Sequence, residues 1–246
     1  MRRLAGGPWR WGWGVLAAWA SAVAIGAAFG RGWLELPDRW NPLAPLWPQE
    51  PPNALTPWKL QRLAGDPAAC SAALKATTLA YAPLPDRPVA GGCGWNDAVR
   101  VEALPARLGA PVVLTCPAAV ALAMWERHAL QPSARSSLGT RVVGVTHFGS
   151  FACRDVAGTG AAEGGGRRSA HATADAIDIA GFALADGSAV TVAGDWPRGH
   201  DDRRGRFLRG ARDGACGLWS VVLGPDYNAA HRDHFHFDRG PWRACR

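Results

Sequence analysis

The sequence predicts an α+β domain: a small, mostly antiparallel sheet with flanking helices, stapled by disulfides and preceded by one N-terminal transmembrane helix. Short apolar runs such as 176–180 and 220–223 are typical of buried strands, and 117–130 is typical of a packed helix. Six cysteines without a C-x-x-C pair indicate up to three disulfides in an oxidising compartment. An uncharged run at residues 11–30 is long enough to cross a membrane.

The N-terminal region predicts export. Residues 1–10 carry three arginines and are expected to stay in the cytoplasm, and residues 11–30 are expected to form a signal anchor. A cleaved signal peptide is the alternative, because Ala20-Ser-Ala22 offers small residues to a peptidase. The retained anchor is favoured because the run is long and its best cleavage site lies inside it. Both interpretations export the rest of the chain.

The remaining chain divides into a spacer and a domain. Residues 31–57 are rich in Pro and Trp, which blocks regular helix and sheet and favours an extended linker. Residues 58–246 are expected to form the domain. Helical patterns predict helices at 59–63, 70–79, 117–130 and 206–216. Strand patterns predict strands at 112–115, 141–148, 177–184, 189–192 and 220–223. Stretches 81–95 and 158–168, rich in Gly or Pro, are expected to be loops.

The basic charge does not indicate a nucleic-acid partner. The chain has 27 Lys and Arg against 20 Asp and Glu, giving a formal net charge of +7. No basic helix, zinc-finger spacing or RNA-binding aromatic motif accompanies this charge. A basic surface also suits an anionic cell-wall polymer. The cysteines leave their connectivity open, because six allow 15 pairings; they are Cys70, Cys93, Cys116, Cys153, Cys216 and Cys245.

Histidine and aspartate cluster in two segments of the C-terminal half. Asp178 lies in an apolar strand-like run, where a charge is costly unless it is paired or bound to a cation. His234 and His236 are two residues apart, so on a strand both rings point to one face while Phe235 packs on the other. Together with His171, these residues suit a zinc ion that keeps one coordination position open for water.

Two resemblances follow from these motifs. Ser169-x-His171 with Asp178, and the terminal His234-x-His236, resemble the zinc peptidases that cut bacterial cell-wall peptides: D-Ala-D-Ala carboxypeptidases, murein endopeptidases and lysostaphin, with the hedgehog domain as a relative. The run from about Cys70 to the end resembles, more closely, the bacterial extensin-like C-terminal domain family. The matching pieces are Cys93-Gly94, Leu114-Thr-Cys116-Pro117, Gly149-Ser-Phe-Ala-Cys153-Arg154, Leu223-Gly-Pro-Asp-Tyr-Asn228 and Asp233-His-Phe-His236.

The resemblance to zinc peptidases implies a function and a ligand set. It implies that His171, Asp178 and His236 bind Zn²⁺ with water as the fourth ligand, and that the substrate is a D-amino-acid-containing peptide of peptidoglycan. His234 is expected to handle the proton, with Asp233 as the candidate from carboxypeptidase relatives and His231 as a third. The expected location is the bacterial inner membrane, as a single-pass protein with the C-terminal domain in the periplasm.

Further residues receive roles from the same motifs. Arg154 is expected to face the substrate carbonyl or carboxylate, where a guanidinium stabilises developing charge. Ser169 is expected to brace the His171 loop, and Asp175 is expected to be solvated. Ala174 departs from the motif, because the related peptidases usually carry glycine there. A non-catalytic module that binds peptidoglycan, or that holds zinc structurally, is the alternative function.

Overall fold

A computed structural model describes residues 9–32, 35–156, 166–198 and 201–246. The expected loop at 158–168 therefore lies mostly outside the described residues. The chain forms two compact units, residues 1–44 and 45–246. The first contains α1 (Trp9–Gly30) and the short 3-10 turn η1 (Asp38–Trp40). Within α1, Gly12–Gly30 is long and apolar enough to cross a membrane, a property that anchors and signal sequences share.

The second unit begins earlier than the sequence pattern indicated. It starts at Pro45, within the stretch expected to be a spacer, whereas the domain was expected from Trp58. Leu46 is buried in the main core, and the Pro48 carbonyl lies 2.8 Å from Nε2 of His128. Lys59 Nζ also donates to the Pro45 carbonyl. Proline density thus identified an irregular backbone here, but these contacts make it part of the globular unit.

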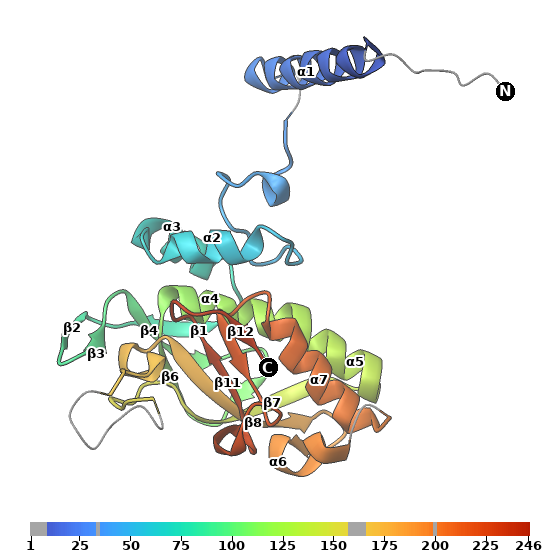
Figure 1. Ribbon diagram of the computed structural model, residues 1–246. Helices are drawn as coiled ribbons and strands as arrows, with labels where there is room; N and C mark the ends of the chain where they lie inside the picture. The colour runs from blue at the N-terminus through green and yellow to red at the C-terminus, as the bar shows by residue number, and fades with distance from the viewer. Residues whose placement is uncertain (1–8, 33–34, 157–165, 199–200) are drawn as a thin grey trace. The chain divides into compact units, whose positions relative to one another are not determined.

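A seven-stranded sheet forms the centre of this unit (Figure 1). Its main path runs β12-β10-β11-β8-β7-β5, and β9 pairs with β8 beside it. Neighbouring strands are antiparallel except β10–β12 and β5–β7. The strands are β5 (Arg107–Leu108), β7 (Val142–Gly149), β8 (Ala176–Leu184), β9 (Ala189–Thr191), β10 (Val221–Leu223), β11 (Phe235–Asp238) and β12 (Ala244–Cys245). The predicted hairpin at residues 177–192 is therefore confirmed.

The described residues also form two smaller sheets, and several strands of these sheets were not predicted. β1 (Ala80–Pro83), β4 (Ala98–Ala103) and β6 (Val112–Thr115) form one, and β2 (Arg87–Ala90) pairs with β3 (Cys93–Trp95) in the other. The expectation that 81–95 is a loop was therefore wrong. Gly91 and Gly92 both have positive φ and close the β2–β3 hairpin, so they act as turn residues between strands. β1 gains its hydrogen-bonding partner only from the distant β4.

The helices largely follow the predicted apolar patterns. They are α2 (Thr56–Leu63), α3 (Pro67–Lys75), α4 (Cys116–Trp125), α5 (Gln131–Leu138), α6 (Val192–Asp195) and α7 (Arg203–Ala215). A π-helical turn at Glu126–Leu130, η2, joins α4 to α5. The helix predicted at 117–130 consequently continues to Leu138, and it ends at Gly139, whose φ of 71° is left-handed.

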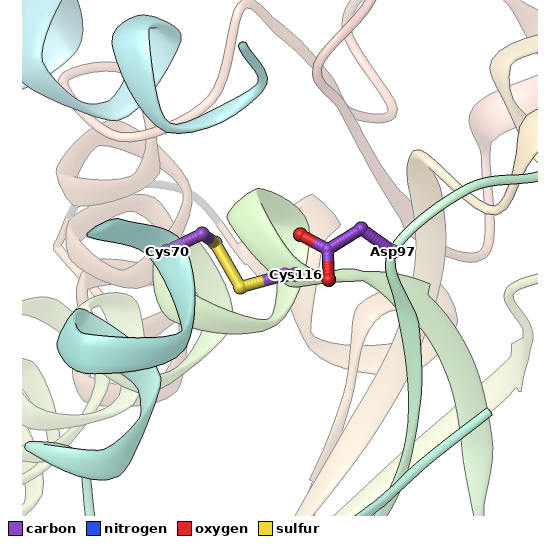
Figure 2. A group of neighbouring side chains, drawn as sticks. All are labelled: Cys70, Asp97 and Cys116. Atoms are coloured by element: carbon purple, nitrogen blue, oxygen red, sulfur yellow. A yellow bond between two sulfur atoms is a disulfide. The ribbon is translucent and has the colours of Figure 1, made fainter. Parts of the chain in front are cut away.

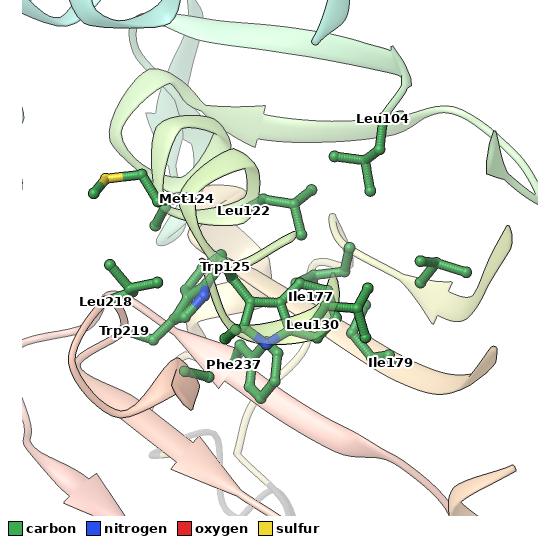
Figure 3. Close-up of a cluster of buried hydrophobic side chains, with 14 of the residues drawn as sticks. Leu104, Leu122, Met124, Trp125, Leu130, Ile177, Ile179, Leu218, Trp219 and Phe237 are labelled. Atoms are coloured by element: carbon green, nitrogen blue, oxygen red, sulfur yellow. The ribbon is translucent and has the colours of Figure 1, made fainter. Parts of the chain in front are cut away.

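The hydrophobic core lies between the helices and one face of the large sheet. The ring of Trp125, at the end of α4, packs against Phe237 of β11 with ring centroids 5.3 Å apart. Its Nε1 donates to the carbonyl of Ala211 in α7. Figure 3 shows Trp125 clustered with Leu130, Ile177 and Phe237. All four side chains are fully buried, and truncating an aromatic in such a core costs about 3–5 kcal/mol. Because this packing occupies one face of β8 and β11, only the opposite face is available for polar side chains.

Three disulfides complete the α+β fold. Cys70–Cys116 links α3 to α4, Cys93–Cys153 links β3 to the segment after β7, and Cys216–Cys245 links the end of α7 to β12. All six cysteines are paired. The predicted class, with small antiparallel sheets, flanking helices, disulfides and one apolar N-terminal helix, is confirmed.

Candidate metal centre

Strand register places an aspartate directly opposite a histidine. In the antiparallel β8–β11 pair, Asp178 is the partner of His236, and Ile177 is the partner of Phe237. Because side chains alternate across a strand, Ile177 and Phe237 enter the core while Asp178 and His236 share the other face. Both polar side chains are nonetheless buried, at 8% exposure each. The alternation of side chains along the strands therefore places a buried pair of polar groups on the face of the sheet opposite the core.

His171 reaches this pair from the connection between β7 and β8. It lies in the 3-10 turn η4 (Ala170–Thr173), whose N-cap Ser169 accepts a hydrogen bond from the His171 amide through Oγ, at 3.3 Å. Ala174 ends the turn in the left-handed region at φ 58°. That conformation costs a non-glycine residue roughly 1–2 kcal/mol. Ser169 braces the loop as expected.

Three donor atoms converge at this point. His171 Nε2 lies 3.2 Å from Asp178 Oδ1 and 3.2 Å from His236 Nδ1, and His236 Nδ1 lies 2.9 Å from the same Asp178 oxygen. In the described part of the chain, these three residues form a group whose potential ligand atoms all lie within 4.8 Å of one another. Donors bonded to zinc at about 2.0–2.1 Å in a tetrahedron are roughly 3.3 Å apart. The spacing therefore fits a zinc ion.

The outer nitrogen of each histidine ring has its own partner. His171 Nδ1 lies 2.5 Å from the Ser150 carbonyl, and His236 Nε2 lies 2.9 Å from Asp238 Oδ2. Neither oxygen can donate in these contacts when Asp238 is ionised, so each ring places its hydrogen on the outer nitrogen. Both inner nitrogens then direct lone pairs at Asp178. Such an arrangement needs a shared proton or a cation, and it is the orientation that metal-binding histidines adopt.

The charges in the site are strongly coupled. Burial alone would raise the pKa of Asp178, but hydrogen bonds and charge from His171 and His236 hold it well below its usual range. Burial alone would lower the pKa of His236, but hydrogen bonds to Asp178 and Asp238 raise it to about 9. In the metal-free protein, a proton on His236 therefore compensates Asp178. A divalent cation would displace that proton.

His234 and Asp233 lie at the edge of this group. His234 Nδ1 is 2.9 Å from Asp233 Oδ1, and its Nε2 is 3.6 Å from Asp178 Oδ1. Asp233 therefore orients the ring and leaves Nε2 free to accept a proton beside the centre. The hydrogen bond to His234 also lowers the pKa of Asp233. Of this pair of candidate bases, His234 is the one turned towards the converging donors.

Arg154 and His231 complete the surroundings. Arg154 Nη2 is 3.6 Å from Asp178 Oδ2, and its half-exposed side chain can contact a ligand from solvent. His231 stacks near His234, with ring centroids 5.3 Å apart, and its Nδ1 lies 2.7 Å from Asn228 Oδ1. Burial, followed by the neighbouring histidines, lowers the pKa of His231 to about 4. His231 is therefore neutral near pH 7.

Two residues differ from the expectations. Asp175 is partly buried rather than solvated, and it accepts hydrogen bonds from Thr115 Oγ1 and Thr173 Oγ1. Its carboxylate stabilises the turn before β8 instead of facing water, because the compact η4 turn folds it inward. Asp238 was missed, although it lies two residues after His236 on the same strand face. The period of two would have identified it as a partner of that ring.

A second group of potential ligands is a disulfide. Cys70, Asp97 and Cys116 also lie close together, but Figure 2 shows the two sulfurs bonded to each other beside the Asp97 carboxylate. A disulfide offers no thiolate to a metal. His171, Asp178 and His236 therefore form the candidate centre.

Comparison with known families gives one result over most of the chain. The family model described as "Extensin-like protein C-terminus" matches residues 68–246, which includes every residue of the candidate centre. No curated protein and no solved structure matches the chain.

Proposed function

The chain belongs to the extensin-like C-terminus family, and we propose that it is an exported zinc-dependent hydrolase of peptide bonds in peptidoglycan. The observation that carries this proposal is the set of three donors 2.9–3.2 Å apart, each histidine held by an oxygen on its outer nitrogen. His171, Asp178 and His236 would hold the ion. Bound zinc supplies Lewis acidity and lowers the pKa of a coordinated water to about 7.

The neighbouring side chains supply the remaining chemistry. His234, oriented by Asp233, takes a proton at Nε2 and returns it to the departing amine. Arg154 places its guanidinium beside Asp178, where it binds the carbonyl oxygen or a terminal carboxylate of the substrate. Phe148 and Tyr227 are exposed aromatic rings that contact His234 and His231. They offer apolar surface to a peptide beside His234 and His231.

The proposed substrate and location draw on different observations. The Ser-x-His and His-x-His motifs resemble those of peptidases that cut D-amino-acid-containing peptides. Three disulfides suit an oxidising compartment such as the periplasm. The apolar α1 suits a single-pass anchor in the inner membrane. Peptidoglycan peptides are accessible to a domain exported in this way.

The activity is tested with purified peptidoglycan. We expect the full-length chain in neutral detergent to release new amino termini, a chelator to abolish the release and added zinc to restore it. Release that persists after complete zinc removal would contradict the mechanism. His171→Ala serves as the inactive control, since it removes one of the three donors while leaving the core face of the sheet intact.

A structural zinc site is the second candidate function. The observation that favours it is the 3.6 Å separation of His234 Nε2 from Asp178 Oδ1, because a small rotation of His234 would supply a fourth ligand. A centre with four protein ligands is closed and structural, whereas an open position is needed for catalysis. The protein would then be a non-catalytic peptidoglycan-binding module.

Metal content separates the two candidates. We expect His171→Ala, Asp178→Ala and His236→Ala each to lose most bound zinc, because each removes one of three ligands. His234→Ala and Arg154→Ala should keep about one zinc per chain while reducing peptide release by roughly 10²–10⁴-fold, the usual size of proton-transfer and charge contributions. Elemental analysis after dialysis measures the zinc. Loss of zinc in His234→Ala as complete as in His236→Ala would establish the closed site.

A further inference from the structure

A cavity of about 610 Å³ lies at the π turn between α4 and α5, and it shares no residue with the candidate metal centre. Its walls come from five parts of the second unit: the segment with Gln49 and Pro51, Thr78, Pro105, the π turn with α5, and the start of β7. A π turn inside a helix widens the backbone and frequently marks a functional position. The polar side chains that line the cavity include Gln49, Glu126, Arg127, Gln131, Arg135 and Arg141.

Three guanidinium groups line this cavity. Within the described residues, the side chains of Arg127, Arg135 and Arg141 form no ion pair or hydrogen bond, and all three are exposed. Among the residues that the structure describes, Glu126 is the only carboxylate of the lining; it is buried at 3% exposure, accepts from Gln131 Nε2 at 2.9 Å and attracts Arg127 and Arg135. Burial raises the pKa of the Glu126 carboxyl, whereas the hydrogen bond from Gln131 and the charges of Arg127 and Arg135 lower it. Three arginines and one carboxylate line the cavity, so positive groups outnumber negative ones there.

Hydrogen bonds hold the cavity walls together. Gln131 Nε2 donates to the Val142 carbonyl at 2.9 Å, and the Val142 amide donates back to Gln131 Oε1 at 3.2 Å. This reciprocal pair of hydrogen bonds holds the start of α5 against the start of β7. The backbone positions of Arg135 and Arg141 therefore keep a fixed distance from each other. On a third side, His128 binds the Pro48 carbonyl next to Gln49. A preformed site loses less entropy when it binds a ligand.

We propose that this cavity binds a phosphate-bearing ligand. Guanidinium groups match the oxygens of phosphate in geometry and charge, and one phosphate monoester, with nearly two negative charges, can engage two or three of them. The volume exceeds that of phosphate alone and accommodates an attached glycerol-sized group. Such a ligand is either a soluble phosphate ester or a phospholipid headgroup.

The headgroup source has its own support in the chain. The wall at Gln49 belongs to the segment that leads back to α1, and only residues 31–44 separate α1 from the second unit. Fully extended, that stretch spans at most about 50 Å. If α1 lies in a membrane, a linker of this length allows the cavity to reach lipid phosphates.

The test uses the full-length chain in neutral detergent after removal of metals by a chelator, so that phosphate cannot bind through zinc. Glycerol phosphate is titrated calorimetrically at constant ionic strength, with acetate as the carboxylate control. Mixed micelles containing phosphatidylglycerol or phosphatidylcholine form the lipid arm. We expect saturable binding of glycerol phosphate, of phosphatidylglycerol micelles, or of both, and weaker binding of acetate and phosphatidylcholine.

Matched variants locate the site. Arg135→Gln and Arg141→Gln should each weaken the binding about tenfold or more, because each removes a charge-assisted contact. Arg100→Gln, an exposed arginine on β4 outside the cavity, should leave it unchanged. Urea unfolding midpoints verify that all three variants remain folded. Absence of saturable binding, equally tight acetate binding, or equal losses in all three variants would each overturn the proposal, and none of these outcomes bears on the zinc hydrolase.

Discussion

Asp178 shows how one residue determines the character of the site. A carboxylate at 8% exposure inside an apolar strand carries a desolvation cost of several kcal/mol. Two histidines and the nearby Arg154 offset that cost, and each of these partners comes from a different segment of the chain. Removing one partner would leave charge buried without compensation. We therefore expect these positions to be more sensitive to substitution than their number of contacts suggests.

The metal-free protein should lose stability as the pH rises. The folded pKa of His236 is about 9, above its ordinary value of about 6.5. A raised pKa contributes stability that is complete below about pH 6.5 and is lost as the pH rises through 9. Urea unfolding of the chelator-treated protein at pH 6.5 and 9.5 should show a decrease on the order of 2 kcal/mol.

A substitution of Asp238 tests the origin of this pH dependence. Asp238→Asn removes one of the two carboxylates that raise the pKa of His236, so the decrease between pH 6.5 and 9.5 should become smaller. Asp213→Asn on α7 is the control, because this exposed carboxylate pairs with Arg212 and not with the site. An unchanged decrease in Asp238→Asn would show that another group causes it.

Sequence periodicity accounts for part of the site but not for its assembly. The alternation in 176–180 and 234–237 predicted which side chains share a face, and His171, Asp178 and His236 do converge. Their binding of zinc stays a prediction. The role of the Ser150 carbonyl had no sequence signal, because every residue carries a backbone carbonyl and only the path of the chain selects one. Asp175 was misjudged for a similar reason, since Thr115 lies far away in sequence.

At the scale of elements, the β8–β11 register is the main determinant of the site. Phe235 pairs with Ile179 and Phe237 with Ile177, so two apolar pairs fix the same register that sets His236 opposite Asp178. A slip by one residue would expose the aromatic rings and turn the polar pair into the core. The core and the candidate centre are therefore specified by the same alternation.

The Cys93–Cys153 disulfide should position Arg154 as well as stabilise the fold. It joins β3 to the residue just before Arg154, across a separation of 60 residues. Replacing both cysteines by serine should lower the free energy of unfolding by about 2–5 kcal/mol. Because the segment then moves more freely, peptide release per folded molecule should fall while bound zinc remains near one per chain.

Removal of the Cys216–Cys245 disulfide provides the matched control. That disulfide joins α7 to β12, away from Arg154. Its replacement by two serines should also reduce stability in urea, but release per folded molecule should stay near the unmodified value. Equal losses of release in both double variants would indicate a general effect of destabilisation rather than a displaced Arg154.

Local sequence rules were weakest where elements depend on distant partners. The helix at 117–130 and the hairpin at 177–192 were recognisable because their patterns are internal to each segment. β1 and β2–β3 were missed because prolines and glycines suppress the strand signal, while their pairing depends on β4 and on the Gly91–Gly92 turn. Context outweighs intrinsic strand preference in such short elements.

At the scale of the whole molecule, α1 and the disulfides are consistent with export. The apolar run of Gly12–Gly30 is suited to a membrane, and all six cysteines are paired in the second unit. Cytosolic proteins rarely carry disulfides, and an apolar helix near the N-terminus is typical of exported chains. The boundary between the two units falls at residue 45, before the Pro-rich segment ends, so part of that segment belongs to the globular unit.

That boundary leads to a prediction about truncation. A chain comprising residues 45–246 should be more stable than one comprising residues 58–246. The shorter chain lacks Leu46, a buried side chain worth about 1.5–3 kcal/mol, and the hydrogen bond between the Pro48 carbonyl and His128. It also lacks Thr56, where α2 begins. Urea unfolding should show a difference of at least about 2 kcal/mol.

A variant of the longer chain separates apolar burial from the other contacts. Leu46→Ala in residues 45–246 should reproduce only part of the stability difference, because the His128 contact and the start of α2 remain in place. If the two truncated chains unfold at the same urea concentration, residues 45–57 act only as a spacer, as the proline pattern alone indicated. If Leu46→Ala reproduces the whole difference, apolar burial is sufficient, and the hydrogen bonds of this segment position the wall of the arginine-lined cavity without contributing to stability.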